Sequence, residues 1–420
     1  MIAFRFGYSV VASTLHDALA VASSTAPVRA LLDDLGGTAG TPPPIVSTAG
    51  PHLFVVATGG TERLLLDAIA ERRVTHPAEP TVLVAHRAHN SLPASLETLA
   101  AIQQSGGRGR IISLSDRDEA DRAILDEAIG DLEAVAAMRT ARLGVVGGPS
   151  SWLVASSPDP DVVRRRWGPE VVTVEPTRMI ELTRTPVTPT GVLAERFTKV
   201  ADPVRSTVDR RAVNDAMGVR SALLDVLDDD HLDAVTVRCF DLLGDPGTSG
   251  CLALASLNDD GIVAGCEGDV PSALAMLWVR HLLDQPTWMA NPASLDVDRN
   301  ELILAHCTVA PSMVESFALD THFESGIGVG ISGTFALQPV TLIRLGGVDL
   351  DECWIAEGDI VSTGDDTDLC RTQVTIALSS GTVGDLLTHP LGNHLVLAAG
   401  HHERRLRAWW NLTIADQLSQ

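Results

Sequence analysis

The sequence predicts an α/β protein with two doubly wound parallel-sheet domains followed by a β-rich, barrel-like domain. As far as residue 284, short apolar runs alternate with segments of helical periodicity, which is typical of strands joined by helices in a parallel sheet. From Pro286 onward, strand-like runs and glycines dominate. The 420 residues also exceed the size at which a single core keeps growing. We therefore expect three domains, at residues 1–140, 141–284 and 285–420.

The first predicted domain is a Rossmann-like parallel sheet. Its clearest strands are three apolar runs, each followed by helical periodicity: Phe54–Ala57, Thr81–Ala85 and Arg110–Leu114. A helical segment rich in Ala and Glu precedes Thr140. A new strand, which ends in a glycine turn, begins directly after it, so the first boundary is expected there.

The second and third predicted domains differ in texture. Strands of the second are expected at Ala141–Gly148, Val171–Val174, Ala234–Val237, Cys251–Ala255 and Ile262–Ala264, and a helix at Val270–Leu283. The third is expected to be β-rich, with one late helical segment near Glu403–Trp410.

Composition excludes some classes of partner. The net charge is −23 and the isoelectric point is near 4.8, so nucleic acids and anionic membrane surfaces, which are polyanions, are not expected to bind. No apolar run approaches the roughly 20 residues that span a bilayer, and the N-terminus lacks the pattern of a secretion signal. The six cysteines form no CxxC pair, which is typical of reduced thiols. We expect a cytoplasmic protein.

Two acids mark a candidate site. Glu267 and Asp269 lie between an apolar run, Gly261–Gly265, and the predicted helix that begins at Val270. In open α/β folds, sites are built where strands end at the carboxyl edge of the sheet. For Asp269 alone, an N-cap on the following helix is the more economical interpretation. That interpretation does not apply to Glu267, which precedes the cap.

Two histidines in the C-terminal third extend this candidate site. His306 ends the apolar run Leu302–Ala305, and His394 begins another at Leu395. A single histidine at such a position is more often a hydrogen-bonded core residue than a ligand. Together, however, carboxylate and imidazole form the ligand set that divalent Mn, Fe, Co or Zn accepts.

Several short motifs, in a specific order, carry a family resemblance. They are Val235–Phe240, Cys266–Asp269, Ala305–Thr308, Thr321–Glu324, Cys370–Val374 and Gly392–His394. In this order the chain resembles the L-fucose isomerase and L-arabinose isomerase superfamily, in particular its shorter fucose isomerase-like branch. The resemblance implies an aldose–ketose isomerase fold, a site for Mn²⁺ or another divalent metal, and a homotrimer or homohexamer.

Carried over to this sequence, the resemblance assigns specific positions. Glu267 matches the family acid that is both metal ligand and catalytic base, and His394 matches the C-terminal histidine ligand. His306 matches a further metal histidine of the arabinose branch. The position of the second family acid is occupied by Asn291, which follows Pro286–Ala290. An amide can offer an oxygen to a metal, but it has no charge and cannot carry a proton.

A small-molecule sugar is the implied substrate, and five residues are expected to bind it. Four lie within or beside the motifs and one lies in a polar turn of the first domain: Arg238, His322, Arg371, Asn393 and Asn90. Arg371 requires an acidic partner, either a side chain or an acidic group on the substrate. Asn90 is expected to face the site of a neighbouring subunit.

Three functional hypotheses remain open at the level of sequence. The first is an aldose–ketose isomerase that acts through an ene-diolate on a small sugar or sugar derivative, with Glu267 as the base and Asp269 as a possible second acid. The second is a metal-dependent lyase, a retro-aldolase or decarboxylase, on a polyhydroxy acid. The third is a sugar-binding homologue without catalysis. Asn291 distinguishes the first hypothesis from the others.

Overall fold

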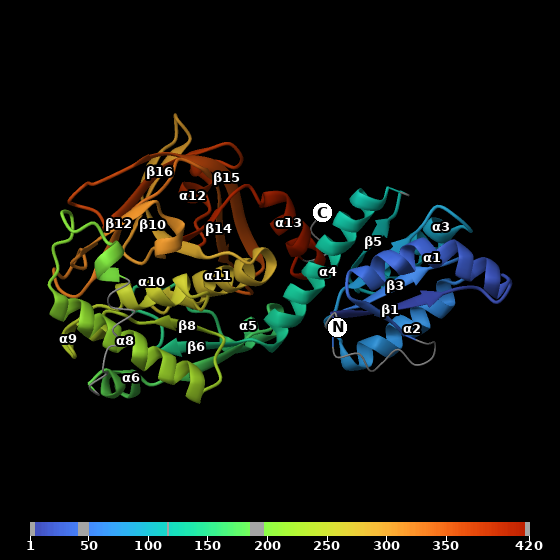
Figure 1. The fold of residues 1–420 in the computed structure, drawn as a ribbon, viewed down its shortest axis with the longest axis horizontal. Coiled ribbons are helices and arrows are strands. Elements are labelled where there is room, and N and C mark those ends of the chain that lie inside the picture. Colours follow the sequence, from blue (N-terminus) through green and yellow to red (C-terminus); the bar gives the residue numbers. More distant parts are fainter. Residues whose placement is uncertain (1–4, 41–49, 116, 185–196, 416–420) are drawn as a thin grey trace. The chain divides into compact units, whose positions relative to one another are not determined.

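A computed structural model describes residues 5–40, 50–115, 117–184 and 197–415. Internal contacts divide the chain into two units. The smaller comprises Met1–Ala137 together with Ala408–Gln420, and the larger comprises Met138–Arg407. In Figure 1 the smaller unit is blue to cyan, with the end of the last helix in red.

The smaller unit contains a five-stranded parallel sheet of order β2-β1-β3-β4-β5. Its central strands are entirely buried, as expected for a sheet that is covered on both faces. The strands are β1 (Phe6–Val11), β2 (Gly37–Ala39), β3 (His52–Val56), β4 (Thr81–Ala85) and β5 (Gly109–Ser113). The helices are α1 (Ala18–Asp34), α2 (Glu62–Thr75), α3 (Ser91–Gln104) and α4 (Asp118–Thr140), which runs on into the larger unit. The three strands predicted here are confirmed.

His52 is a buried imidazole in this sheet. It lies at the start of β3, and its Nε2 is 2.8 Å from Oγ of Ser9 on β1. Burial, assisted by the positive charge of Arg72, lowers the pKa of His52 to about 3. The folded unit therefore keeps this histidine neutral at pH values where the unfolded chain, with a pKa near 6.5, binds a proton.

This difference predicts a loss of stability in mild acid. The contribution of His52 is fully present above pH 6.5 and is lost as the pH falls toward 3, so about 2 kcal/mol should be lost between pH 8 and pH 5. His52→Asn should remove that part of the pH dependence, whereas His389→Asn, at an exposed histidine, should not. Urea unfolding of both variants at the two pH values measures it, and equal pH dependence in wild type and His52→Asn would contradict the assignment.

The larger unit begins with a four-stranded parallel sheet of order β7-β6-β8-β9. Its strands are β6 (Arg142–Val146), β7 (Glu170–Val174), β8 (Ala234–Val237) and β9 (Val263–Cys266). The accompanying helices are α5 (Pro160–Arg166), α6 (Pro176–Thr183), α8 (Arg210–Asp229), α9 (Asp241–Gly244), α10 (Cys251–Asp259) and α11 (Val270–Leu283). Helix α11 has the predicted bounds.

One predicted strand of this sheet is wrong, because Cys251–Ala255 forms the start of helix α10. Eight of the nine residues of α10 are buried, so the helix is apolar on every side and shows no periodicity that would separate it from a buried strand. Its Leu and Ala residues favour a helix, and it contains no β-branched residue. That composition was the available signal.

A closed six-stranded barrel of order β10-β11-β16-β15-β14-β17 follows. Its strands are β10 (Thr287–Asp296), β11 (Glu301–His306), β14 (Pro339–Gly346), β15 (Glu352–Thr363), β16 (Thr372–Leu378) and β17 (Leu395–Ala399). A separate hairpin pairs β12 (Ser316–Asp320) with β13 (Gly330–Thr334). Besides the predicted late helix, α13 (Glu403–Thr413), the structure has a short helix α12 (Val383–Thr388) and a 3₁₀ turn η1 (Pro311–Met313). Two parallel α/β sheets and a barrel confirm the predicted fold class.

Helix α11 connects the four-stranded sheet to the barrel. Eleven of its fourteen residues are buried, and it contacts both β9 and β14. A helix that is apolar all round must be covered on all sides, so α11 packs between β9 of the sheet and β14 of the barrel. The sheet and the barrel lie in one unit by contacts, and the domain boundaries at 140 and 284 remain a prediction.

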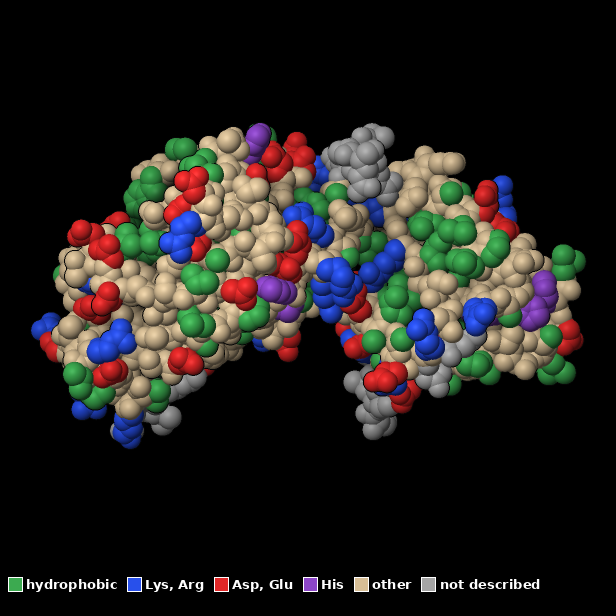
Figure 2. Space-filling view, turned by 90° about the horizontal axis from the view of Figure 1, so that it is seen from above, with side chains coloured by type: hydrophobic (Ala, Val, Ile, Leu, Met, Phe, Trp, Pro, Cys, Tyr) green, Lys and Arg blue, Asp and Glu red, His purple; other side chains and the backbone are tan. Residues whose placement is uncertain are grey.

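The surface carries charges of both signs. Over the face of the larger unit in Figure 2, arginine and acidic side chains are interspersed. Among the residues that the structure describes, no helix is long and apolar enough to cross a membrane.

Candidate metal centre

The turn after β9 presents Glu267. This residue has a φ of 62°, in the left-handed region that a side chain other than Asn or Asp rarely adopts. Three backbone bonds hold the turn, from Ser150 to the carbonyl of Glu267, from Gly268 to Val237 and from Asp269 to Cys266. Such strained backbone conformations persist only where the surrounding structure holds them, and they are often found at functional sites.

The barrel supplies the two histidines. His306 is the last residue of β11, and His394 immediately precedes β17. Both strands flank β10, and their ends meet at its middle, because Ala305 pairs with Asn291 and Leu395 pairs with Ala290. The ring centroids of the histidines lie 5.6 Å apart.

Glu267, His306 and His394 converge. Each is buried, and their possible ligand atoms all lie within 4.8 Å of one another. Oε1 of Glu267 is 3.5 Å from Nε2 of His394. The structure thus brings together the three residues that the sequence singled out, from three separate elements of the fold.

The hydrogen bonds around this cluster leave the inner nitrogen atoms available. Nδ1 of His306 bonds to Oγ1 of Thr308 at 2.9 Å, and Nδ1 of His394 bonds to Oδ2 of Asp269 at 2.9 Å. Nε2 of His394 is buried and has no hydrogen-bond partner among the described residues. Histidines that ligate metals typically donate their other nitrogen to such outer partners. The donor set therefore fits a divalent cation.

Asp269 has a different environment from Glu267. It is fully buried, caps α11 through the backbone N–H of Ser272, and pairs with Arg344 at 3.0 Å. Arg344, on β14, also donates to the hydroxyls of Ser272 and Ser156. The predicted cap is confirmed. The buried pair directs Asp269 toward the outer nitrogen of His394, which argues for a supporting function and against proton transfer to a substrate.

Sequence reasoning missed Arg344. It lies on β14, where every residue after Pro339 is buried, 75 residues from Asp269, and no local signal connects the two. Gly392 packs against it in the structure: its φ is 144°, and a Cβ atom there would collide with the guanidinium of Arg344. Removing one partner of a buried pair costs about 3–5 kcal/mol, so this contact also supports the fold.

The cluster is electrostatically asymmetric. Burial opposes protonation of His394, but Asp269 and Glu267 outweigh it and raise the pKa of His394 to about 9. Burial and the neighbouring His394 lower the pKa of His306 to about 4. Burial alone would raise the pKa of Glu267, but His394 and the hydrogen bond from Trp152 hold it below its ordinary value. The carboxylates on both sides of His394 thus favour its charged form, whereas an imidazole that binds a cation must be neutral.

Asn291 lies beside both histidine strands. Side chains alternate along a strand, so Asn291 shares a face with Met289, whose sulfur accepts the backbone N–H of Cys266 at 3.1 Å. This face is directed toward the turn that carries Glu267. The side chain of Asn291 is half-buried.

The residues predicted to bind substrate have varied surroundings. Arg238 pairs with Asp241 at 2.8 Å. His322 bonds to Ser325 and stacks edge-on against Phe240. Arg371 donates to the carbonyl of Thr321, lies 3.5 Å from Asp320 and packs over Phe323, so it has partners within the protein.

The two asparagines are exposed. Asn393 directly precedes His394. Asn90 precedes α3 in the smaller unit, with a φ of 58°. Whether either of them contacts a substrate stays a prediction.

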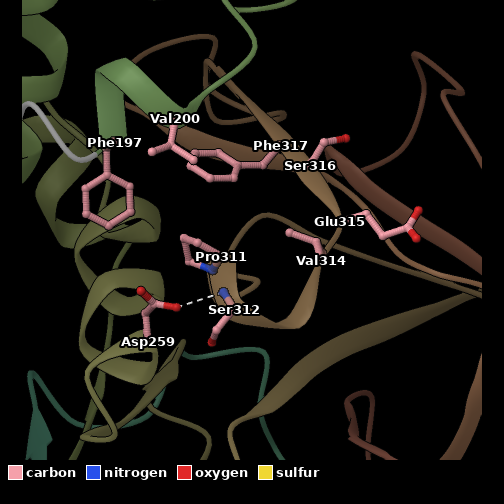
Figure 3. A pocket seen from close by; sticks show the side chains of 9 residues that line it. All are labelled: Phe197, Val200, Asp259, Pro311, Ser312, Val314, Glu315, Ser316 and Phe317. Carbon is pink, nitrogen blue, oxygen red and sulfur yellow. Dashed lines mark hydrogen bonds between the residues drawn. The ribbon is translucent and has the colours of Figure 1, made fainter.

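A separate cavity of about 290 Å³ lies between α10 and the hairpin strand β12. Figure 3 shows Phe197, Phe317 and Pro311 on its walls, with Asp259 accepting a bond from the backbone of Ser312. Among the residues that the structure describes, its lining contains no histidine, cysteine or basic residue.

Comparisons with known proteins identify relatives. No protein-family model matches the chain. A sulfoquinovose isomerase of Alkalicoccus urumqiensis is 24% identical over 242 residues, which cover 54% of this chain and 53% of that protein. Another, from Clostridium sp. (strain MSTE9), is 34% identical over 124 residues, or 27% of each chain. The chain is similar, over these stretches, to proteins named sulfoquinovose isomerase.

A third match, to the sulfoquinovose isomerase of Priestia aryabhattai, is 29% identical over 80 residues and covers 19% of this chain and 18% of that protein. The chain thus spans about half or less of the length of the curated relatives it matches. At this modest identity the matches support the superfamily relationship that the motifs predicted.

Proposed function

We propose that this protein is a metal-dependent aldose–ketose isomerase that acts on a sugar derivative. The convergence of Glu267, His306 and His394 is the observation that carries the proposal. The relatives named as sulfoquinovose isomerases give the reaction class and suggest an acidic sugar as substrate. Mn²⁺ or another divalent metal is the proposed cofactor.

In the proposed reaction, Glu267, His306 and His394 hold the cation. When bound, a cation would supply Lewis-acid chemistry toward the oxygens of the open-chain sugar. Glu267 removes the proton from one of these carbons and returns it to the other, as a general base and then a general acid. The pKa of Glu267 lies below its ordinary value, which keeps the carboxylate ionised. Thr308 and Asp269 orient the two histidines through their outer nitrogen atoms.

Asn291 keeps the second hypothesis open. A lyase reaction on a polyhydroxy acid also needs stabilisation of an ene-diolate, but it needs no second proton carrier, and an amide such as Asn291 cannot carry a proton.

Arg238 and Arg371 are proposed to bind the acidic group of the substrate, although each also has a carboxylate partner in the protein. His322 and Asn393 are proposed to contact sugar hydroxyls.

The assembly and location remain proposals. We propose a homotrimer or homohexamer in which Asn90 faces a neighbouring site, and sedimentation showing an active monomer at micromolar concentration would contradict it. We propose the cytoplasm as the location, which agrees with six free cysteines.

Purified protein loaded with Mn²⁺ should interconvert sulfoquinovose and its ketose in deuterated water, with deuterium incorporated at the carbon that exchanges its proton. NMR measures both events. Glucose, which lacks the sulfonate, is the matched substrate and should react far more slowly. Cleavage products in place of a ketose would favour the lyase, and saturable binding without exchange would favour a sugar-binding protein.

A further inference from the structure

We propose that Trp152 is a positioning residue for Glu267: its indole N–H holds the carboxylate so that the other carboxylate oxygen faces the two histidines. The inference rests on the proposed function, because it assigns a residue to the same centre. Trp152 is absent from the motifs that predicted the site.

The contacts of the carboxylate carry this inference. Nε1 of Trp152 donates to Oε2 of Glu267 at 2.6 Å. The opposite oxygen, Oε1, is the atom that lies 3.5 Å from Nε2 of His394. The two oxygens are therefore distinguished, one occupied by the indole and one directed at the cluster. A charge-assisted bond of this length is among the stronger hydrogen bonds in proteins.

The loop that carries Trp152 also holds the backbone of the same turn. This loop follows β6, and only β8 lies between β6 and β9 in the sheet. The N–H of Ser150 donates to the carbonyl of Glu267 at 2.9 Å. Gly268 has a φ of 73°, and a Cβ atom there would collide with the carbonyl of Gly148. Backbone and side chain of Glu267 are thus fixed by one segment.

The exposure of Trp152 argues against a role in the core. Half of its surface, 50%, is exposed, so burial of the ring explains only part of its position. A half-exposed indole could donate to water, yet here it donates to a buried carboxylate. Phe240 packs edge-on against it with centroids 5.0 Å apart, and Phe240 in turn contacts His322. These contacts set the angle of the indole.

The test measures Mn²⁺ affinity, by electron paramagnetic resonance of the free ion, together with thermal stability. Trp152→Phe removes the N–H but keeps a ring against Phe240. We expect Mn²⁺ binding to weaken by about 10–100-fold, the usual effect of losing an outer-sphere partner. The thermal midpoint should change little, because the site is half-exposed. Trp152→His, which restores a ring N–H, should recover part of the affinity.

Two controls separate the hydrogen bond from general effects. Trp354→Phe removes an indole N–H that has no partner among the described residues, and Mn²⁺ affinity should stay unchanged. Phe240→Leu removes the ring contact but keeps the N–H, and should weaken binding less than Trp152→Phe.

The outcomes distinguish this inference from the proposed function. Wild-type affinity in Trp152→Phe, or equal losses in the Phe and His variants, would overturn the positioning assignment. Glu267→Ala tests the centre itself. If Glu267→Ala binds Mn²⁺ as wild type does, the proposed centre is wrong whatever Trp152 does. If Glu267→Ala loses the ion while Trp152→Phe does not, only the inference about Trp152 fails.

Discussion

Glu267→Gln is expected to abolish isomerisation and leave the protein folded. The amide has nearly the same size as the carboxylate and still offers an oxygen to the indole N–H of Trp152, which donates to Glu267 at 2.6 Å in the wild type. It cannot accept the substrate proton, and loss of general acid–base transfer typically costs about 10²–10⁴-fold. It also removes a ligand charge. The turnover rate at saturating Mn²⁺ should therefore fall by at least that factor.

The measurement compares Glu267→Gln with Glu315→Gln, which makes the same chemical change at an exposed acid. Deuterium exchange at the sugar carbon should disappear with isomerisation in the first variant and persist in the second. Full exchange in Glu267→Gln would show that another group is the base. If the wild type shows no activity and Glu267→Gln binds the sugar as tightly as the wild type does, the non-catalytic hypothesis is favoured.

The fold class could be predicted because the spacing of apolar residues and the turn residues differ between the segments that form the α/β sheets and the segment that forms the barrel. Strands such as Thr81–Ala85 are buried on both faces and read as continuous apolar runs followed by helical periodicity. Helix α10 could not be separated from a strand in the same way, because it too is buried all round. Its Ala and Leu content was a weaker signal than the length of the run.

The candidate site was predictable where its residues stand at the ends of strands. Glu267, His306 and His394 each adjoin an apolar run, so their strand-end position can be read from sequence, and the fold then brings the three ends together. Arg344 and Trp152 were missed because their partners are 75 and 115 residues away. Nothing local distinguishes a tryptophan in a polar turn from one on a surface.

For Asp269 the sequence left two interpretations, a helix cap and a possible second catalytic acid, and the structure shows the contacts that bear on them. As the cap of α11 it has a local reason to be an acid, and this bond is present. Its second oxygen meets the imidazole of His394 and the guanidinium of Arg344. One carboxylate thus ties the start of a helix, a barrel strand and a proposed metal ligand together, which explains why it is fully buried. Pair formation with arginine holds its pKa well below the ordinary value.

The register of the barrel gives Asn291 its importance. It stands where β10 changes partners, with Ala290 paired to the residue after His394 and Asn291 paired to the residue before His306. Ala290 and Asn291 are thus the two residues of β10 at the junction between the histidine strands in the described register. An acid at this position would add a charged ligand and a second proton carrier to the cluster.

Asn291→Asp is accordingly expected to tighten Mn²⁺ binding by about tenfold or more, the size of a modest gain in ligand charge. If the protein is an isomerase that tolerates the amide, turnover should rise, by up to the roughly 10²-fold of a restored proton carrier. If it has evolved a different reaction, the added charge should instead depress that activity, because it competes for the proton or repels an acidic substrate. Asn214→Asp places the same charge on the exposed face of α8 and should change neither quantity. An Asn291→Asp protein that matches wild type in both affinity and rate would place this residue outside the centre.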